Sequence, residues 1–167
     1  IQLEASLACA PLTRQALDIN SLEQVVEACF EYRPDFIVNC AAYTKVDQAE
    51  SEPDAAFDVN SKGAANLARA ANRLKTGLVH ISTDFVFDGT KTGMYHEDDP
   101  LRPQSVYGQS KLEGETQVLR LHDQSIVLRT GWVYSKLGKN FLRTILKASK
   151  EQDCLRIVAD QVGTPTY

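Results

Sequence analysis

The sequence predicts an α/β protein built on a Rossmann-like, doubly wound parallel sheet. Short apolar runs recur along the chain, segments with helical start signals separate them, and two long connections, 40–50 and 83–105, follow the ends of apolar runs. This alternation implies right-handed β-α-β crossovers, and ligands of such sheets bind beyond the carboxyl ends of the strands. The chain has 167 residues, of which 43% are hydrophobic and 24% charged, so we expect one domain spanning 1–167.

Four apolar runs are expected to form strands that are buried on both faces. They are rich in β-branched residues or leucine and lack strict polar alternation, as is typical of strands in a covered parallel sheet. They are FIVN at 36–39, GLVHIS at 77–82, SIVLRT at 125–130 and LRIV at 155–158.

Four helices are expected beside these strands. Ser21 and Gln24 form a capping-box pattern at the start of the first helix, and Pro34 ends it. Pro53 stands in the first turn of the second helix, among acidic residues that favour a helix amino terminus. Alanines along that helix predict a close approach to the sheet. The expected ranges are 22–32, 51 to about Leu74, a helix beginning near Val106, and about 139–149.

Charge and hydropathy exclude several classes of partner. The formal net charge is -4, from 22 acidic and 18 basic residues, and the basic residues are scattered. We therefore expect no nucleic-acid partner. No stretch approaches the roughly 20 apolar residues that a membrane helix needs, and the amino-terminal residues lack a basic leader region. The sequence is thus expected to be soluble and cytoplasmic, with no membrane partner.

Cysteines and acidic residues do not form a recognisable metal motif. The four cysteines lack a CxxC pair or zinc spacing and stand among apolar residues, so we expect buried, reduced thiols. The cluster HEDDP at 96–100 is interpreted as a solvated loop. Three histidines, His80, His96 and His122, have no evident partner and are expected to be structural or surface residues.

The segment SVYGQSKLEGE places Tyr107 four residues before Lys111, so both share one helix face. The pattern alone also fits a surface pair, but its position matters. It follows a strand that ends in Ser82, Thr83 and Asp84. A lysine ammonium near a phenol lowers the phenol pKa and favours proton transfer near neutral pH. These residues together could protonate a carbonyl oxygen as hydride arrives.

Thr83, Tyr107 and Lys111 resemble the catalytic residues of the extended short-chain dehydrogenase/reductases. From about residue 14 onward the chain is more narrowly similar to the dTDP-4-dehydrorhamnose reductases. The similar segments are NCAAYTKVDQAESEP (39–53), STDFVFDG (82–89), VYGQSKLEGE (106–115), RTGWVY (129–134), KNFLRTIL (139–146) and DQVGTPTY (160–167).

This resemblance implies the reduction of the C4 ketone of dTDP-4-dehydro-L-rhamnose by NADPH or NADH. Tyr107 would donate the proton, Thr83 would hydrogen-bond the reacting oxygen, and Lys111 would bind the nicotinamide ribose and lower the pKa of Tyr107. Asp84 and Trp132 match substrate-contacting positions. Positions matching cofactor contacts are Asp18, Ile19, Ala42, Tyr43, Thr44 and Ile81, together with Tyr107 and Lys111.

The resemblance further implies a dTDP-linked 4-keto sugar as partner and a possible homodimer. Some members use Mg²⁺, but no ligands for it can be placed in this chain. Trp132, the only tryptophan, stands just past a strand, where it could pack on a sugar or base, although a core position is an equal alternative.

The sequence departs from the family pattern at both ends. It has no Gly-x-x-Gly-x-x-Gly loop to hold a pyrophosphate at a helix amino terminus. We therefore expect that the first strand and the C-terminal substrate region are missing, so that 1–167 form an incomplete NAD(P)-binding domain.

Two other functions stay open on the sequence alone. One is a sugar-nucleotide dehydratase or epimerase, although the dehydratases carry Asp-Glu where this chain has Asp84-Phe85, and phenylalanine cannot transfer a proton. The other is a non-catalytic, cofactor-binding subunit resembling the β subunit of methionine adenosyltransferase.

Overall fold

A computed structural model describes residues 7–158 and 160–167, and it contains a three-stranded parallel sheet. The strands β1 (Phe36–Asn39), β2 (Gly77–Thr83) and β3 (Ser125–Thr130) lie in the order β1-β2-β3. The predicted α/β class and three of the predicted strands are thereby confirmed. Their expected burial on both faces was wrong, because Val38, Ile126 and Leu128 on one face are exposed. The fourth was wrong: residues 155–158 form no strand, since an apolar run needs a neighbouring strand to pair with, and this one has none among the described residues.

Helices occupy the connections, largely as expected. The segment after Glu52 forms one continuous helical run in three parts, of which the middle part is a π-helix. A short helix in the first long connection was not predicted. The elements are α1 (Leu22–Tyr32), α2 (Val46–Ala49), α3 (Pro53–Phe57), the π-helix η1 (Asp58–Gly63), α4 (Ala64–Leu74), the 3-10 helix η2 (Asp84–Val86), α5 (Val106–Leu121) and α6 (Phe141–Ala148).

Local side-chain caps fix where the longer helices begin. The hydroxyl of Ser21 accepts a hydrogen bond from the Gln24 amide at 3.3 Å, as the capping-box pattern predicts. The hydroxyl of Ser105 accepts from the Gly108 amide at 3.1 Å and starts α5. Because these caps are local, the sequence alone could place both helix starts.

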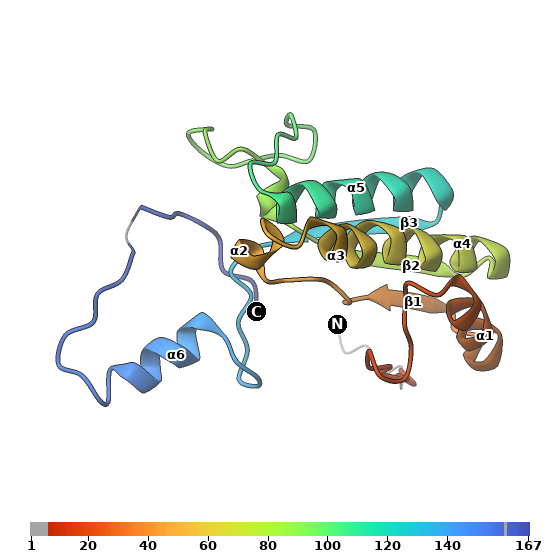
Figure 1. The fold of residues 1–167 in the computed structure, drawn as a ribbon, viewed down its shortest axis with the longest axis horizontal. Coiled ribbons are helices and arrows are strands. Elements are labelled where there is room, and N and C mark those ends of the chain that lie inside the picture. Colours follow the sequence, from red (N-terminus) through yellow and green to blue (C-terminus); the bar gives the residue numbers. More distant parts are fainter. Residues whose placement is uncertain (1–6, 159) are drawn as a thin grey trace, which may run out of the picture.

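The core lies between the sheet and the helices α4 and α5, which run along one face of it (Figure 1). Leu78 of β2 packs against Val118 of α5 and a row of buried alanines on α4, namely Ala64, Ala68 and Ala71. Alanine side chains allow the backbone of α4 to approach the sheet closely, as predicted. A second cluster joins α1 to α4 through Val25, Cys29, Leu67 and Ala70.

The two faces of the sheet differ in character. On the face covered by α4 and α5, side chains become polar toward the carboxyl ends of the strands, from Leu78 to His80 and Ser82. The opposite face carries apolar side chains that remain exposed, including those of Val38, Ile126 and Leu128. The polar end of the covered face lies next to both long connections.

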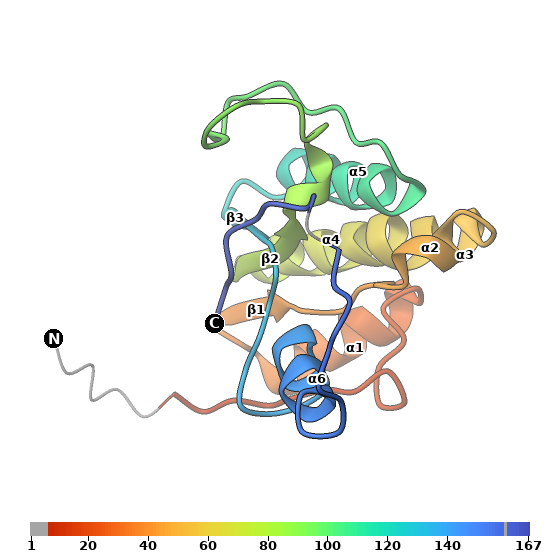
Figure 2. The ribbon, with the colours of Figure 1, turned by 90° about the vertical axis from the view of Figure 1, so that its left-hand side faces the viewer.

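Residues after β3 depart from the sheet. Segment 131–167 carries α6 and returns toward the sheet only near the carboxyl terminus, where Val133 forms a bridge with Thr166 (Figures 1 and 2). No residue of α6 is buried. Within the described residues, no helix is both long and apolar enough to cross a membrane.

The cysteine expectation was wrong for three residues. Cys29 is buried in the contact between α1 and α4, but Cys9, Cys40 and Cys154 are exposed. Apolar neighbours in sequence do not bury a thiol when its segment packs against little else, as around Cys154. All four thiols are free.

Candidate active site

The carboxyl end of β2 is the centre of the candidate site. Its last two residues, Ser82 and Thr83, are buried. The Thr83 hydroxyl accepts a hydrogen bond from the Phe85 amide at 3.2 Å and so caps the 3-10 helix η2. The chain therefore turns sharply after Thr83, and Asp84 begins the long connection directly beside it.

Tyr107 lies in the first turn of α5, next to this turn. Its ring packs edge-on against the ring of Phe85, with centroids 5.5 Å apart at 78°. A side chain on Gly108 would collide with the Phe85 carbonyl, so the glycine lets α5 approach η2 this closely. The sequence predicted that Tyr107 would meet Thr83, and the structure brings the two together.

The pKa of Tyr107 is raised, mainly because burial disfavours the phenolate. The Thr83 hydroxyl acts in the lowering direction, while the negative charge of Asp84 raises the pKa further. The net direction is opposite to the one expected from the sequence. At neutral pH the phenol is protonated, which is the form that can donate a proton.

Lys111 lies one helical turn beyond Tyr107 and is almost fully buried. Its ammonium donates a hydrogen bond to the Ile81 carbonyl oxygen at 2.7 Å, so it points toward the end of β2. Burial lowers the pKa of Lys111 to about 8, and the carboxylate of Glu115 acts in the opposite direction. Lys111 thus reaches the end of β2 beside Ile81, and Tyr107 meets Thr83 at the same end. The pKa of Tyr107 is set by burial, Thr83 and Asp84 and not by the ammonium of Lys111, which the sequence had led us to expect.

Asn60 joins the first long connection to α5, and no sequence pattern indicated this role. Its side-chain oxygen accepts from the Tyr43 amide at 2.8 Å, and its amide donates to the Tyr43 carbonyl at 3.2 Å and to the Ser110 hydroxyl at 2.9 Å. The Ser110 hydroxyl donates in turn to the Tyr107 carbonyl at 2.8 Å. Asn60 belongs to the π-helix η1, a helix type that often marks functional positions.

An ion pair between a buried carboxylate, Glu115, and a partly exposed guanidinium, Arg129, joins α5 to β3 beside the end of β2. The carboxylate of Glu115, on α5, accepts a hydrogen bond from the Ser82 hydroxyl at 2.5 Å. It also pairs with the guanidinium of Arg129 on β3 at 2.7 Å. The carboxylate raises the pKa of Arg129, which stays charged. Sequence reasoning missed this pair, although a charged residue in the apolar run SIVLRT was a signal for it.

His80 is the partner of Asn39 across the sheet. The two residues are in register, and the Asn39 amide lies 2.9 Å from Nδ1 of His80. Burial, together with the nearby positive charge of Lys111, lowers the pKa of His80 to about 4. His122 contacts the Thr76 carbonyl through Nε2 at 2.7 Å. Both histidines are buried, and each has a hydrogen-bond partner that the sequence had not indicated.

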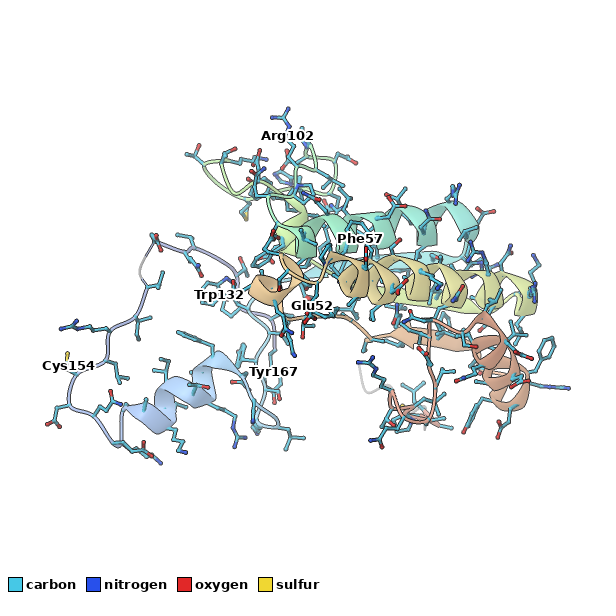
Figure 3. The ribbon with its side chains drawn as sticks, in the orientation of Figure 1. Glu52, Phe57, Arg102, Trp132, Cys154 and Tyr167 are labelled. Atoms are coloured by element: carbon cyan, nitrogen blue, oxygen red, sulfur yellow. The ribbon has the colours of Figure 1, made fainter. Side chains whose placement is uncertain are left out.

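The remaining predicted residues are more dispersed. Ala42, Tyr43 and Thr44 lie in the connection that follows β1. Asp84 abuts Gly131, the residue before Trp132. Trp132 is 42% exposed, so it is not a core residue, and its ring packs edge-on against Phe141 of α6 at 6.0 Å. In Figure 3, Trp132 lies beyond the ends of the strands, between the sheet and the segment that carries α6.

Asp18 and Ile19 lie near the junction of η1 and α4. The side chain of Ile19 occupies the space next to Gly63, the last residue of η1, and its carbonyl accepts from the Asn66 amide at 2.9 Å. They are therefore not at the end of β2. Across 7–158 and 160–167, no group of three or more His, Cys, Asp or Glu side chains is arranged to hold a metal ion.

A family model and curated relatives both match this chain over most of its length. The family described as "RmlD substrate binding domain" matches residues 2–167. A curated dTDP-4-dehydrorhamnose reductase from Aggregatibacter actinomycetemcomitans is 48% identical over 151 residues, covering 90% of this chain and 51% of that protein. The spore coat polysaccharide biosynthesis protein SpsK of Bacillus subtilis (strain 168) is 42% identical, covering 98% of this chain and 58% of that protein.

Solved structures agree with these relatives. The dTDP-4-dehydrorhamnose reductase (rfbD) of Bacillus anthracis str. Ames, in complex with NADP, is similar with a TM-score of 0.92 and 44% identity. That match covers 95% of this chain and 56% of that chain. The orthologue from Clostridium acetobutylicum ATCC 824 gives a TM-score of 0.90 at 43% identity, covering 94% of this chain and 56% of that one. The chain therefore spans about half the length of the proteins it matches.

Proposed function

Since the chain belongs to the RmlD substrate binding domain family, with dTDP-4-dehydrorhamnose reductases among its relatives, we propose that it carries the reacting residues of an NAD(P)H-dependent ketoreductase. The reaction is the reduction of the C4 ketone of dTDP-4-dehydro-L-rhamnose to dTDP-L-rhamnose, for cell-surface polysaccharide. The observation that carries this proposal is the gathering of Thr83, Tyr107 and Lys111 at the end of β2.

The bound nicotinamide cofactor would supply the hydride, and the chain's own residues would handle the oxygen. Tyr107 stays protonated because burial and Asp84 raise its pKa. As the ketone carbon becomes tetrahedral, its oxygen takes the phenolic proton, so the phenol O–H bond breaks and an alcohol O–H bond forms. The Thr83 hydroxyl would hold the same oxygen in line, because it is fixed at the end of a strand.

Lys111 fits the ribose-binding role by charge and position. A lysine with a pKa of about 8 is mostly protonated at neutral pH, so it can donate to ribose hydroxyls. Its carbonyl partner, Ile81, is itself a predicted cofactor contact, which supports a position of the ammonium beside the cofactor. As pH rises past about 8 the ammonium is lost, and cofactor affinity should fall.

We propose that the connection holding Ala42, Tyr43 and Thr44 forms part of that wall. The double hydrogen bond from Asn60 to the Tyr43 backbone keeps this connection rigid. Asp18 and Ile19 would flank the adenine, and residues 1–167 would form one NAD(P)-binding domain. Asp84 and Trp132 would contact the dTDP-linked sugar, and the exposed ring of Trp132 suits stacking on a sugar or base. A cytoplasmic homodimer is part of the proposal.

Dehydration is disfavoured by the phenylalanine at position 85. The Phe85 ring packs against Tyr107 where a dehydratase would need a second proton-transferring group. A role as a non-catalytic subunit predicts nucleotide binding without turnover. A turnover assay with the keto sugar therefore distinguishes that role from the reductase.

The direct test uses the full-length protein that contains this chain. Purified protein, NADPH or NADH and dTDP-4-dehydro-L-rhamnose should give cofactor oxidation and dTDP-L-rhamnose in equal amounts. Lys111→Met should weaken NADPH binding at least tenfold, because it removes the ammonium but keeps most of the side-chain volume. NADPH binding without reduction of the keto sugar would contradict the proposal.

A further inference from the structure

We propose that Glu115 and Arg129 are positioning residues, which hold the connection 84–105 and the end of β2 in place for the reaction. The proposal rests on the proposed reductase function. Neither residue belongs to the set predicted to touch cofactor or substrate, and their effect would act through the residues that do.

Glu115 fixes the end of β2 from the side of α5. Its side chain is 2% exposed, so the carboxylate depends on its protein partners for compensation. It accepts the Ser82 hydroxyl at 2.5 Å and the Nε of Arg129 at 3.0 and 3.2 Å. Ser82 immediately precedes Thr83, so the carboxylate restrains the strand residue next to the proposed reacting hydroxyl.

Arg129 extends this restraint to the long connection. Its Nη1 donates to the Glu97 carbonyl at 3.2 Å, and its guanidinium carbon lies 5.2 Å from the centroid of the Phe87 ring. A guanidinium can pair with a carboxylate through one edge, donate to a carbonyl through another and present its face to an aromatic ring. One side chain on β3 thus holds both α5 and the connection.

Residues in the middle of the connection pack against one another and, through Phe87, against Arg129. The rings of Phe87 and Tyr95 are stacked at 4.3 Å, and the Tyr95 hydroxyl donates to Asp88 at 2.9 Å. The connection begins with Asp84 and Phe85, and Phe85 contacts Tyr107. Loss of the anchor should therefore loosen the residues on the substrate side of the reacting phenol.

A purely structural role is the alternative, and a double variant separates the two. Removing one member of a buried ion pair leaves the other charge uncompensated and destabilises a protein, whereas replacing both members is often tolerated. Each of Glu115→Gln and Arg129→Gln should therefore lower the unfolding temperature. The double variant, with two neutral amides that can pair, should recover most of it but cannot restore the contacts to Glu97 and Phe87.

Two readouts on the full-length protein test the proposal, and one does not require the proposed activity. Amide hydrogen exchange of residues 87–97 should be at least tenfold faster in the double variant than in the wild type, without any ligand. With NADPH and dTDP-4-dehydro-L-rhamnose, kcat should fall by about 30- to 100-fold, as expected for small misplacements of reacting groups. The control variant, Asp58→Asn with Lys62→Gln, removes an exposed ion pair and should change neither readout.

Opposite results would overturn the proposal. If the double variant regained wild-type stability and wild-type kcat together, the pair would be structural only. If exchange of 87–97 stayed at the wild-type rate, Arg129 would not hold the connection. Should the wild-type protein fail to reduce the keto sugar, the proposed function itself would fail, and the positioning role for that reaction would be overturned with it. The exchange result would still decide whether the anchor exists.

Discussion

The two faces of the sheet differ in the burial and the polarity of their side chains. On the face toward α4 and α5, buried polar side chains gather at the carboxyl ends of the strands, and each finds a partner on a neighbouring element, as Asn39 does with His80 and Ser82 does with Glu115. On the other face, Val38, Ile126 and Leu128 are apolar and exposed. These hydrogen bonds offset the loss of water on burial, although Nε2 of His80 is buried without a hydrogen-bond partner among the described residues.

The covered face also differs along its length, because the proposed reacting residues lie near its polar end and the packed core lies at its apolar end. The polar end of the covered face lies beside Tyr107 and Lys111 of α5, whose ammonium donates a hydrogen bond to the Ile81 carbonyl. The apolar end, around Leu78, contributes hydrophobic packing and contains no residue of the proposed site. Substitutions on the two faces should therefore differ in size and in kind.

The largest stability difference should come from a matched pair of leucines. Leu78 is 1% exposed on the covered face, and Leu128 is 46% exposed on the other. Leu78→Ala should lower the free energy of unfolding by about 3–4 kcal/mol through lost packing and a cavity. Leu128→Ala should cost less than about 1 kcal/mol. If chemical denaturation gave equal losses of unfolding free energy for the two variants, the two faces would not differ in burial as described.

A substitution in the contact between α5 and η1 should lower the free energy of unfolding nearly as much as Leu78→Ala. A methyl group on Gly114 would collide with the carbonyl of Asn60, whose side chain holds Tyr43. Gly114→Ala should destabilise the protein by about 2–3 kcal/mol, since backbone must move to make room. The control Thr116→Ala, exposed on the same helix, should stay close to the wild type in thermal unfolding.

The buried histidine should make stability depend on pH. Its folded-state pKa of about 4 lies below the ordinary value of 6.5, so the unfolded state binds the proton more readily. Stability should fall as pH drops from about 7 to 5, and His80 should account for about 2 kcal/mol of that fall. Denaturation across this range should show a flatter profile for His80→Asn, whereas His96→Asn, in the exposed connection, should keep the wild-type slope.

The smallest effect is expected on the exposed apolar face. Ile126→Thr replaces one β-branched side chain with another and removes little buried area, because Ile126 is exposed. Its cost in free energy of unfolding should stay within about 0.5 kcal/mol. A loss above about 2 kcal/mol in the same denaturation experiment would mean that this face is covered.

Local patterns in the sequence predicted the features that depend on near neighbours. Ser21 and Ser105 cap helices within their own turns, and the spacing of Tyr107 and Lys111 puts both on one side of α5. The resemblance to dTDP-4-dehydrorhamnose reductases and the parallel sheet were confirmed. The roles assigned to individual site residues stay predictions.

Features that depend on distant partners were missed or wrong. Glu115 and Arg129 meet only because α5 packs across β3, and the register that pairs Ser82 with Arg129 cannot be read from either segment. The π-helix that places Asn60 has the same apolar pattern as an α-helix. The run at 155–158 has strand-like residues but, in the described part of the chain, no neighbour to pair with.

The central claim is that Tyr107, at the polar end of the covered face, donates the proton. It is tested most directly by comparing kcat of Tyr107→Phe with that of Tyr32→Phe, an exposed tyrosine on α1, in the full-length protein with NADPH and the keto sugar. The account predicts a loss of about 10²- to 10⁴-fold for Tyr107→Phe with NADPH affinity nearly unchanged, and wild-type rates for Tyr32→Phe. A Tyr107→Phe variant that kept more than half of the wild-type rate would contradict it.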